Sequence, residues 1–193
     1  MPRNIEIKAR LTEGIEAVLP RAEALSGAPA QVLQQDDSFF QVPHGRLKLR
    51  AFADGSAELI HYHRADTQAA KASDYVRTPV ADADGLREAL VRACGSAGRV
   101  RKTRWLCLVG ATRIHLDRVA GLGDFMELEV VLTEAQSDAD GTAIAEDLMQ
   151  QLGLGAAPRI AAAYVDLLDD SVDGTVADAL VARTPCNHGA SPS

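Results

Sequence analysis

The chain has 193 residues, 47% of them hydrophobic, which is enough apolar material for one substantial core and favours a single domain. Its 20 Lys and Arg are outnumbered by 27 Asp and Glu, so the formal net charge is −7. A net negative surface gives no general electrostatic reason to bind nucleic acid or an anionic membrane, so any phosphate binding must be local. No apolar run approaches the roughly 20 residues needed to cross a bilayer.

The three cysteines, Cys94, Cys107 and Cys186, show no metal-binding spacing. An odd number of thiols in a chain without a signal-like N-terminus is typical of a reducing compartment, so a cytoplasmic location is expected. Buried or incidental thiols are expected at all three positions.

The first segment with a clear period is RNIEIKAR at Arg3–Arg10, which alternates polar and apolar residues as a half-buried strand does. Helical spacing follows from Thr12 to a glycine stop at Gly27, with a kink or a late start expected at Pro20. Four more strands are then expected, at Gln31–Val42, Arg46–Phe52, Ser56–Arg64 and Asp74–Val80. The short turns between them indicate a meander.

The second half of the chain again places helices between strands. Helices are expected over about Asp82–Cys94 and Ser137–Leu152, with a short one over Ile160–Leu168. Strands are expected at Val100–Val109, Thr112–Val119 and Asp124–Leu132, the first two joined by a tight hairpin around Gly110. Residues 169–193 are polar, rich in small residues and poorly patterned. We therefore expect one domain over residues 1–168 and a disordered or weakly docked tail.

About eight mostly sequential antiparallel strands predict an α+β fold in which an eight-stranded antiparallel β-barrel, closed or nearly closed, carries its helices on the outside. Several of these strands have a charged residue in every second place. Such a face either points outward into solvent or lines a wet cavity inside the barrel. The pattern alone does not choose between the two.

The charged faces sort by sign, which favours the cavity. RLKLR and RKTR are basic and MELEV is acidic, while only IEIK and ELIHYHR carry both signs. Arg and Lys at i, i+2 suit a polyphosphate, because a guanidinium binds phosphate oxygens bidentately. Glu127 and Glu129 suit a hard cation that bridges phosphate oxygens. A lumen with this much charge argues against a lipocalin-like barrel, whose interior should be apolar.

The chain carries several motifs in a fixed order: IEIK near the N-terminus, paired basic residues on the middle strands, RKTR followed by HLDRVAGLGDFMELEV, and the closing AYVDLL. Taken together, these motifs resemble the CYTH superfamily, the triphosphate tunnel enzymes. The group includes class IV adenylyl cyclases, thiamine triphosphatases and inorganic triphosphatases. The resemblance implies an eight-stranded antiparallel tunnel that binds a triphosphate with basic side chains and holds a divalent metal, Mg²⁺ or Mn²⁺, with acidic ones.

The resemblance also assigns roles to residues of this chain. Its ExExK motif supplies Glu6 and Lys8, but the first Glu is Asn4 here, which brings no charge to the metal site. Phosphate ligands are expected at Lys8, Lys48, Arg50, Arg64, Arg77, Lys102 and Arg104. Metal ligands are expected at Glu6, Glu58, Asp117, Glu127 and Glu129, with Glu58 compensating for Asn4. Lys8, Glu6 and Asp117 are the expected catalytic residues.

Three further residues have two interpretations each. His115 shares the inward parity of Asp117 and is either a hydrogen-bonding wall residue, which we favour, or a proton shuttle. Tyr164 and Asp166 either pack a helix onto the barrel, which we favour, or line one end of the tunnel.

These observations predict a Mg²⁺-dependent enzyme acting on a triphosphate. Attack of the ribose 3′-hydroxyl of ATP on the α-phosphorus would make it an adenylyl cyclase, which the resemblance slightly favours. Attack of water on the terminal phosphorus would make it a triphosphatase for inorganic triphosphate, thiamine triphosphate or a nucleoside triphosphate. A non-catalytic binder of nucleotides or polyphosphate is the third alternative. The expected partner is a small molecule bearing a triphosphate, without nucleic acid or membrane, and a homodimer is one option.

Overall fold

The computed structural model describes residues 3–63 and 74–169, so the predicted phosphate ligand Arg64 and the predicted tail beyond residue 169 lie outside the described residues. Eight strands form one antiparallel sheet in the order β1-β8-β7-β6-β2-β3-β4-β5. They are β1 Arg3–Arg10, β2 Gln31–Phe40, β3 Arg46–Phe52, β4 Ala57–His63, β5 Asp74–Pro79, β6 Ser96–Val109, β7 Thr112–Val119 and β8 Gly123–Leu132.

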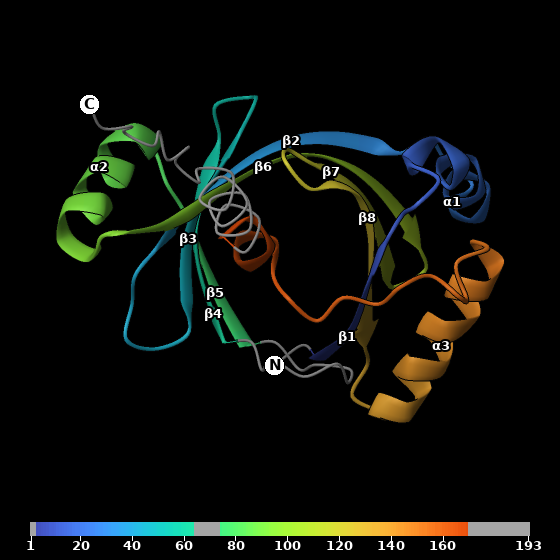
Figure 1. Ribbon diagram of the computed structural model, residues 1–193. Coiled ribbons are helices and arrows are strands. Elements are labelled where there is room, and N and C mark those ends of the chain that lie inside the picture. The colour runs from blue at the N-terminus through green and yellow to red at the C-terminus, as the bar shows by residue number, and fades with distance from the viewer. Residues whose placement is uncertain (1–2, 64–73, 170–193) are drawn as a thin grey trace, which may run out of the picture.

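The sheet curls strongly, so that its concave side encloses a space (Figure 1). The predicted eight-stranded antiparallel sheet with outer helices is confirmed. The curl stops short of full closure, because β1 and β5 are the two edges of the sheet and do not pair with each other in the part of the chain described. The molecule is therefore a half-barrel.

Three α-helices cover the convex side: α1 Leu19–Ser26, α2 Ala83–Cys94 and α3 Asp138–Gln151. A 3₁₀ turn at Ile15–Ala17 precedes α1, which starts late because Pro20 fits only the first turn of a helix. The carboxylate of Asp82 caps α2 by accepting from the backbone N–H of Gly85 at 2.9 Å. The predicted helices over Asp82–Cys94 and Ser137–Leu152 are thus confirmed to within one residue at each end, and the one predicted from Thr12 has the late start expected at Pro20.

The main core lies between the sheet and two of these helices. The outward-facing residues of β1, β7 and β8 pack against α1 and α3, and the fully buried side chains include Ile5, Leu116, Leu128 and Met149. A smaller cluster around Leu49 packs the outer face of β3 against α2. Because this face is apolar, the alternate positions, which carry the charges, point into the concave side.

The C-terminal segment crosses the concave side instead of joining the outer helices (Figure 1). Residues 158–160 add to the edge of β1, where the backbone N–H of Arg10 donates to Pro158 and that of Ile160 donates to Lys8. The chain then forms a helical turn at residues 164–169, whose side chains join a cluster with inward-facing residues such as Phe125. This segment therefore covers the β1 edge and closes one end of the concave side.

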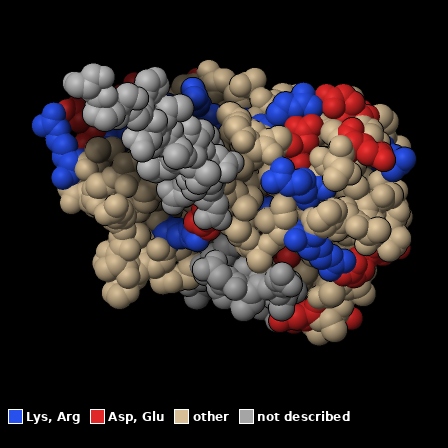
Figure 2. All heavy atoms as spheres, viewed as in Figure 1, with Lys and Arg blue, Asp and Glu red and all other residues tan. Residues whose placement is uncertain are grey.

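Positive and negative side chains are interspersed over the face of the molecule that Figure 2 shows, without a large patch of one sign. No helix in residues 3–63 or 74–169 is long and apolar enough to cross a membrane.

Candidate functional site

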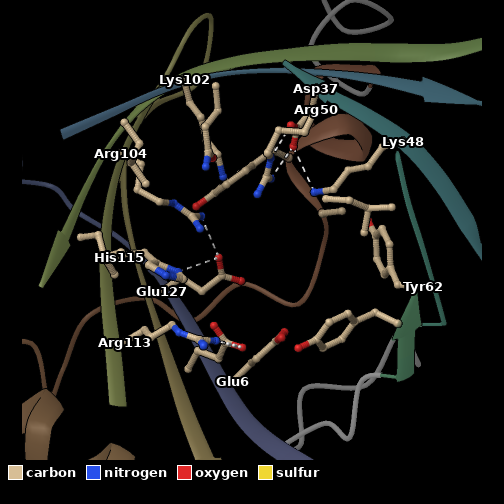
Figure 3. A pocket seen from close by; sticks show the side chains of 18 of the residues that line it. Glu6, Asp37, Lys48, Arg50, Tyr62, Lys102, Arg104, Arg113, His115 and Glu127 are labelled. Atoms are coloured by element: carbon tan, nitrogen blue, oxygen red, sulfur yellow. Dashed lines mark hydrogen bonds and ion pairs between the residues drawn. The ribbon is translucent and has the colours of Figure 1, made fainter. Parts of the chain in front are cut away.

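The concave side holds a cavity of about 400 Å³ to which all eight strands contribute. Its polar wall residues are Glu6, Lys8, Gln35, Asp37, Lys48, Arg50, Tyr62, Tyr75, Arg77, Lys102, Arg104, Arg113, His115, Glu127, Glu129 and Tyr164. Apolar residues also line it: Leu33, Phe52, Ile60, Leu106 and Ala163. Figure 3 shows the charged side chains from strands far apart in the sequence pointing toward one common space.

One side of the cavity, here called the basic wall, consists of Lys48 and Arg50 on β3 and Lys102 and Arg104 on β6 (Figure 3). Each Lys-x-Arg pair shares one buried carboxylate from a neighbouring strand. Asp37 on β2 accepts from Lys48 Nζ at 3.0 Å and from Arg50 Nε and Nη2 at 2.7 Å each. A carboxylate that binds both side chains fixes them in place before any ligand arrives.

The second pair repeats this arrangement. Asp117 on β7 accepts from Lys102 Nζ at 3.0 Å and from Arg104 Nε and Nη2 at 2.6 Å each. The hydroxyl of Tyr164 donates to the same carboxylate at 3.1 Å. Four cations on two carboxylates leave the basic wall with an excess of two positive charges when both lysines are protonated.

Burial and crowding shift the pKa values on this wall. Burial, and then the neighbouring Arg50, lower the pKa of Lys48 to about 8. Burial and Arg104 lower the pKa of Lys102 to about 7. Burial alone would raise the pKa of Asp37, but Lys48 and Arg50 outweigh it and hold that pKa well below its usual range. The carboxylates therefore stay ionised while the lysines approach neutrality near physiological pH.

The opposite side, here called the acidic wall, consists of Glu6 on β1 and Glu127 and Glu129 on β8. Glu127 has two cationic neighbours: Lys8 Nζ lies 3.8 Å from one of its oxygens and Arg104 Nη2 lies 3.3 Å from the other. Burial would raise the pKa of Glu127, but the charges of Lys8 and Arg104 hold it well below its usual range. This carboxylate is therefore charged at neutral pH.

His115 lies beside Glu127, with 3.9 Å between its Nδ1 and the nearer carboxylate oxygen (Figure 3). That distance is too long for a hydrogen bond, and Nδ1 is buried with no hydrogen-bond partner in the part of the chain described. Burial and Arg104 lower the pKa of His115, so its imidazole is neutral at pH 7. A neutral imidazole has one nitrogen without a proton, so His115, which lines the cavity, can accept a proton.

Glu129 accepts hydrogen bonds from an asparagine and an arginine. Asn4 Nδ2 donates to Glu129 Oε1 at 2.8 Å and lies 3.4 Å from Glu6 Oε1. Arg113 Nη1 donates to the same Glu129 oxygen at 3.0 Å. Asn4, which stands where the related motif has a glutamate, therefore bridges two carboxylates.

Two of the predicted metal ligands do not reach the cavity. Asp117 is fully buried beneath Lys102 and Arg104, which use both of its oxygens. Glu58 is outside the cavity lining and accepts from Arg77 with both oxygens at 2.7 Å. Alternation along a strand had correctly placed Asp117 on the inner face, but it carries no information on depth below that face. Neither carboxylate is presented to a metal in this structure.

Other residues of the site were not singled out from the sequence. Asp37, Gln35 and Arg113 all lie at inward positions that strand alternation could have given, since Arg113 is two residues before His115 and Asp37 two after Gln35. The β2 sequence QVLQQDDSFF lacks a polar–apolar alternation that would single out Gln35 and Asp37, whereas Arg113 shares the alternation of His115 and Asp117 and was still missed. The predicted site residues Glu6, Lys8, Lys48, Arg50, Arg77, Lys102, Arg104, Glu127 and Glu129 all line the cavity.

The C-terminal segment takes part in the site, contrary to the favoured expectation that it packs only on the outside. The ring of Tyr164 lies under two cations, with Lys8 Nζ 4.5 Å and Lys102 Nζ 5.1 Å from its centroid. Asp166 accepts from Arg46 Nη1 and Nη2 at 2.9 Å each, which anchors the helical turn to β3. Tyr164 therefore closes one end of the cavity.

A sequence model of the CYTH domain matches residues 2–164. The chain belongs to the CYTH domain family. CYTH proteins are triphosphate tunnel enzymes that act on triphosphate substrates and generally depend on divalent metal ions. The comparison of this chain with curated proteins found no match.

Solved structures similar to the CYTH chain cover most of it. The PH1012 protein of Pyrococcus horikoshii is 26% identical with a TM-score of 0.75, over 86% of this chain and 99% of that one. A conserved hypothetical protein of Pyrococcus furiosus is 20% identical with a TM-score of 0.73, over 85% and 99%. A putative adenylate cyclase of Vibrio parahaemolyticus is 21% identical with a TM-score of 0.70, over 86% and 98%.

The acidic wall has the donor chemistry for the divalent ion that the family implies, since hard cations of this kind take carboxylate and amide oxygens. Glu6, Glu127 and Glu129 supply carboxylates, and Asn4 Oδ1 is buried without a hydrogen-bond partner among the described residues. No three acidic, His or Cys side chains in residues 3–63 and 74–169 are already gathered as a metal cluster. The donors fit a cation, but they must change partners to bind it.

Proposed function

We propose that this CYTH protein is a metal-dependent enzyme that converts ATP to cyclic AMP and pyrophosphate. The observation that carries the proposal is one cavity in which a preformed basic wall faces an acidic wall. Phosphoryl chemistry needs mainly positioning and charge neutralisation, and this cavity supplies both.

The basic wall would bind the phosphate chain. Arg50 and Arg104 each present a guanidinium fixed by a buried carboxylate, and Lys48 and Lys102 add point charges beside them. A bound polyanion favours the protonated lysines and so restores the charge that burial weakens. We assign Asp117 a positioning role here, because it holds Lys102 and Arg104 from beneath and has no oxygen turned to the cavity.

The apolar part of the same cavity favours an organic triphosphate over inorganic triphosphate. Phe52, Ile60 and Leu106 line it together with the rings of Tyr62 and Tyr75. An inorganic chain of phosphates makes no use of such surface, whereas a nucleoside buries apolar area there. A volume of about 400 Å³ is within the range of cavities that enclose small organic ligands.

In the proposed reaction the 3′-oxygen bonds to the α-phosphorus, and the bond from that phosphorus to the oxygen bridging to the β-phosphorus breaks. The leaving oxygen departs with its electron pair as part of pyrophosphate, and the 3′-hydroxyl gives up its proton. We propose neutral His115, whose side chain lines the cavity, as the group that accepts this proton. Lys8 would contact a phosphate oxygen from the acidic side.

Glu6, Glu127 and Glu129 are the residues proposed to hold a divalent cation, Mg²⁺ or Mn²⁺. Such a cation, when bound, neutralises negative charge on phosphate oxygens and on the leaving pyrophosphate.

Hydrolysis of the triphosphate is the second candidate. The same neutral His115 would accept a proton from water instead of a ribose hydroxyl, so the two reactions differ in the nucleophile and in the phosphorus that it attacks. The substrate would then be a nucleoside triphosphate, thiamine triphosphate or inorganic triphosphate.

The test is to incubate the purified protein with ATP and Mg²⁺ or Mn²⁺ and to identify products by anion-exchange chromatography and mass spectrometry. We expect cyclic AMP and pyrophosphate in equal amounts. If ADP and phosphate form instead, the protein is a hydrolase and not a cyclase. If no products form from ATP, inorganic triphosphate or thiamine triphosphate, an enzymatic role is refuted. Arg50→Gln should lose product formation. Arg99→Gln, which alters an outward-facing Arg paired with Asp36, should retain it.

A further inference from the structure

Three strands bring two carboxylates, an amide and a guanidinium together at one end of the acidic wall. Glu6 on β1 and Glu129 on β8 are directly opposite each other, and Arg113 on β7 is directly opposite Glu129 from the other side. Two like charges facing each other across a strand pair repel unless something positive lies near them. The sequence thus creates a need for a cation at Glu6 and Glu129.

The protein's own donors meet this need in the described structure. Arg113 Nη1 is 3.0 Å and Asn4 Nδ2 is 2.8 Å from the same oxygen of Glu129, and the Asn4 amide nitrogen also lies 3.4 Å from Glu6. A divalent cation that binds Glu129 through this oxygen would have to displace both donors, and at the other oxygen it would still lie close to the positive charge of Arg113. Both donors therefore oppose a metal at this carboxylate.

Neither donor is locked in its present place. The side chain of Arg113 is 44% exposed, while that of its partner Glu129 is 17% exposed, so the guanidinium can move away from Glu129 and stay in contact with solvent. The other end of the Asn4 amide, Oδ1, is buried with no hydrogen-bond partner in the part of the chain described. A half-turn of the amide would exchange the two ends and place an oxygen beside Glu6 and Glu129.

We propose that Arg113 and Asn4 act as a built-in substitute for a divalent cation at Glu6 and Glu129. A metal binds there only when Arg113 leaves Glu129 and the Asn4 amide turns its oxygen to the carboxylates. The inference rests on the metal dependence in the proposed function. It adds that the free protein holds a metal at this end of the acidic wall weakly, because two of its own side chains compete for the same carboxylate.

The first experiment titrates Mn²⁺ alone into the free protein and follows unbound Mn²⁺ by electron paramagnetic resonance. Arg113→Gln should bind Mn²⁺ about two- to fivefold more tightly than the wild type, the shift that an ion pair of this exposure can oppose. The matched control is Arg77→Gln. It removes the same charge from the same cavity at 51% exposure, but its partner is Glu58, which does not line the cavity.

An equal gain in Mn²⁺ affinity for Arg113→Gln and Arg77→Gln would overturn the proposal, because it would show only a general effect of net charge. No gain for Arg113→Gln would overturn it as well. The titration contains no triphosphate, so its outcome does not depend on whether the protein is a cyclase, a hydrolase or a binder.

A second variant tests Asn4 through stability. Asn4→Asp places a third carboxylate beside Glu6 and Glu129, so its melting temperature without metal should fall and Mn²⁺ should raise it more than it raises that of the wild type. An equal or smaller rise with Mn²⁺ would contradict a cation position at Asn4.

Discussion

The two walls of the cavity hold their charges differently. On the basic wall each carboxylate binds a lysine and an arginine at 2.6–3.0 Å, and both carboxylates are buried below the cations they hold. On the acidic wall Arg104 and Lys8 lie 3.3 and 3.8 Å from Glu127, and the carboxylates face the cavity. The basic wall is therefore preorganised for phosphate, whereas the acidic wall can exchange protein partners for a metal.

The largest expected effect comes from removing a carboxylate of the basic wall. Asp37→Asn should lower the free energy of unfolding by about 3–5 kcal/mol, because it leaves Lys48 and Arg50 buried without a counter-charge. The neighbouring Asp36→Asn breaks an exposed pair with Arg99 and should cost about 1 kcal/mol or less. Urea denaturation of both variants measures the difference. Equal losses would show that burial of the Asp37 carboxylate does not matter.

The second-largest expected effect is a loss of phosphate binding on the basic wall. Arg50→Gln should weaken binding of inorganic triphosphate by about tenfold or more, because a hydrogen bond to a charged group is worth about 1.5–3 kcal/mol. Isothermal titration calorimetry measures this, with Arg99→Gln as the outward-facing control. Unchanged affinity in Arg50→Gln would mean that the phosphates lie elsewhere.

Glu6 and Lys8 separate the two kinds of wall on a single strand. Glu6→Gln should lower the activity, and more Mg²⁺ or Mn²⁺ should partly restore it. Lys8→Ala should lower the activity about tenfold at every metal concentration, since it removes a phosphate contact. The measurement is activity against metal concentration at fixed substrate. Identical metal dependence of both variants would remove the distinction between the walls on β1.

The smallest effect is a pH dependence of phosphate binding. Lys48, whose pKa is lowered to about 8, is mostly neutral at pH 9, and a bound polyanion should raise this pKa. Binding should therefore take up protons at pH 8–9 and take up few through this group at pH 6, where Lys48 is already charged. Calorimetry in buffers of different ionisation enthalpy measures the uptake. Lys48→Arg, which stays charged, should bind with less uptake, and uptake equal to the wild type would exclude Lys48 as its source.

Strand alternation made most of the fold predictable. Arg3–Arg10 and Thr112–Val119 were bounded correctly, because each alternates without interruption and ends at a turn. The end of the curl was not predictable, since closure depends on how strands are sheared and on whether β1 meets β5. The path of the C-terminal segment across the concave side also left no local signal, because its apolar residues suit either face.

For the site, strand alternation predicts which residues face the cavity but not how deeply each is buried. Lys48, Arg50, Lys102 and Arg104 were placed on the inner face because they recur in basic pairs. The resemblance predicts Asp117 as a metal ligand, and its place beneath Lys102 and Arg104 becomes visible only when neighbouring strands are paired.

The most direct test of the account is a crystal structure of the protein with Mn²⁺ and α,β-methylene ATP, a non-cleavable analogue. The account predicts phosphate groups within hydrogen-bond reach of Lys48, Arg50, Lys102 and Arg104, and an anomalous Mn²⁺ peak between them and the acidic wall. A triphosphate bound outside the cavity, or Mn²⁺ bound away from Glu6, Glu127 and Glu129, would contradict it.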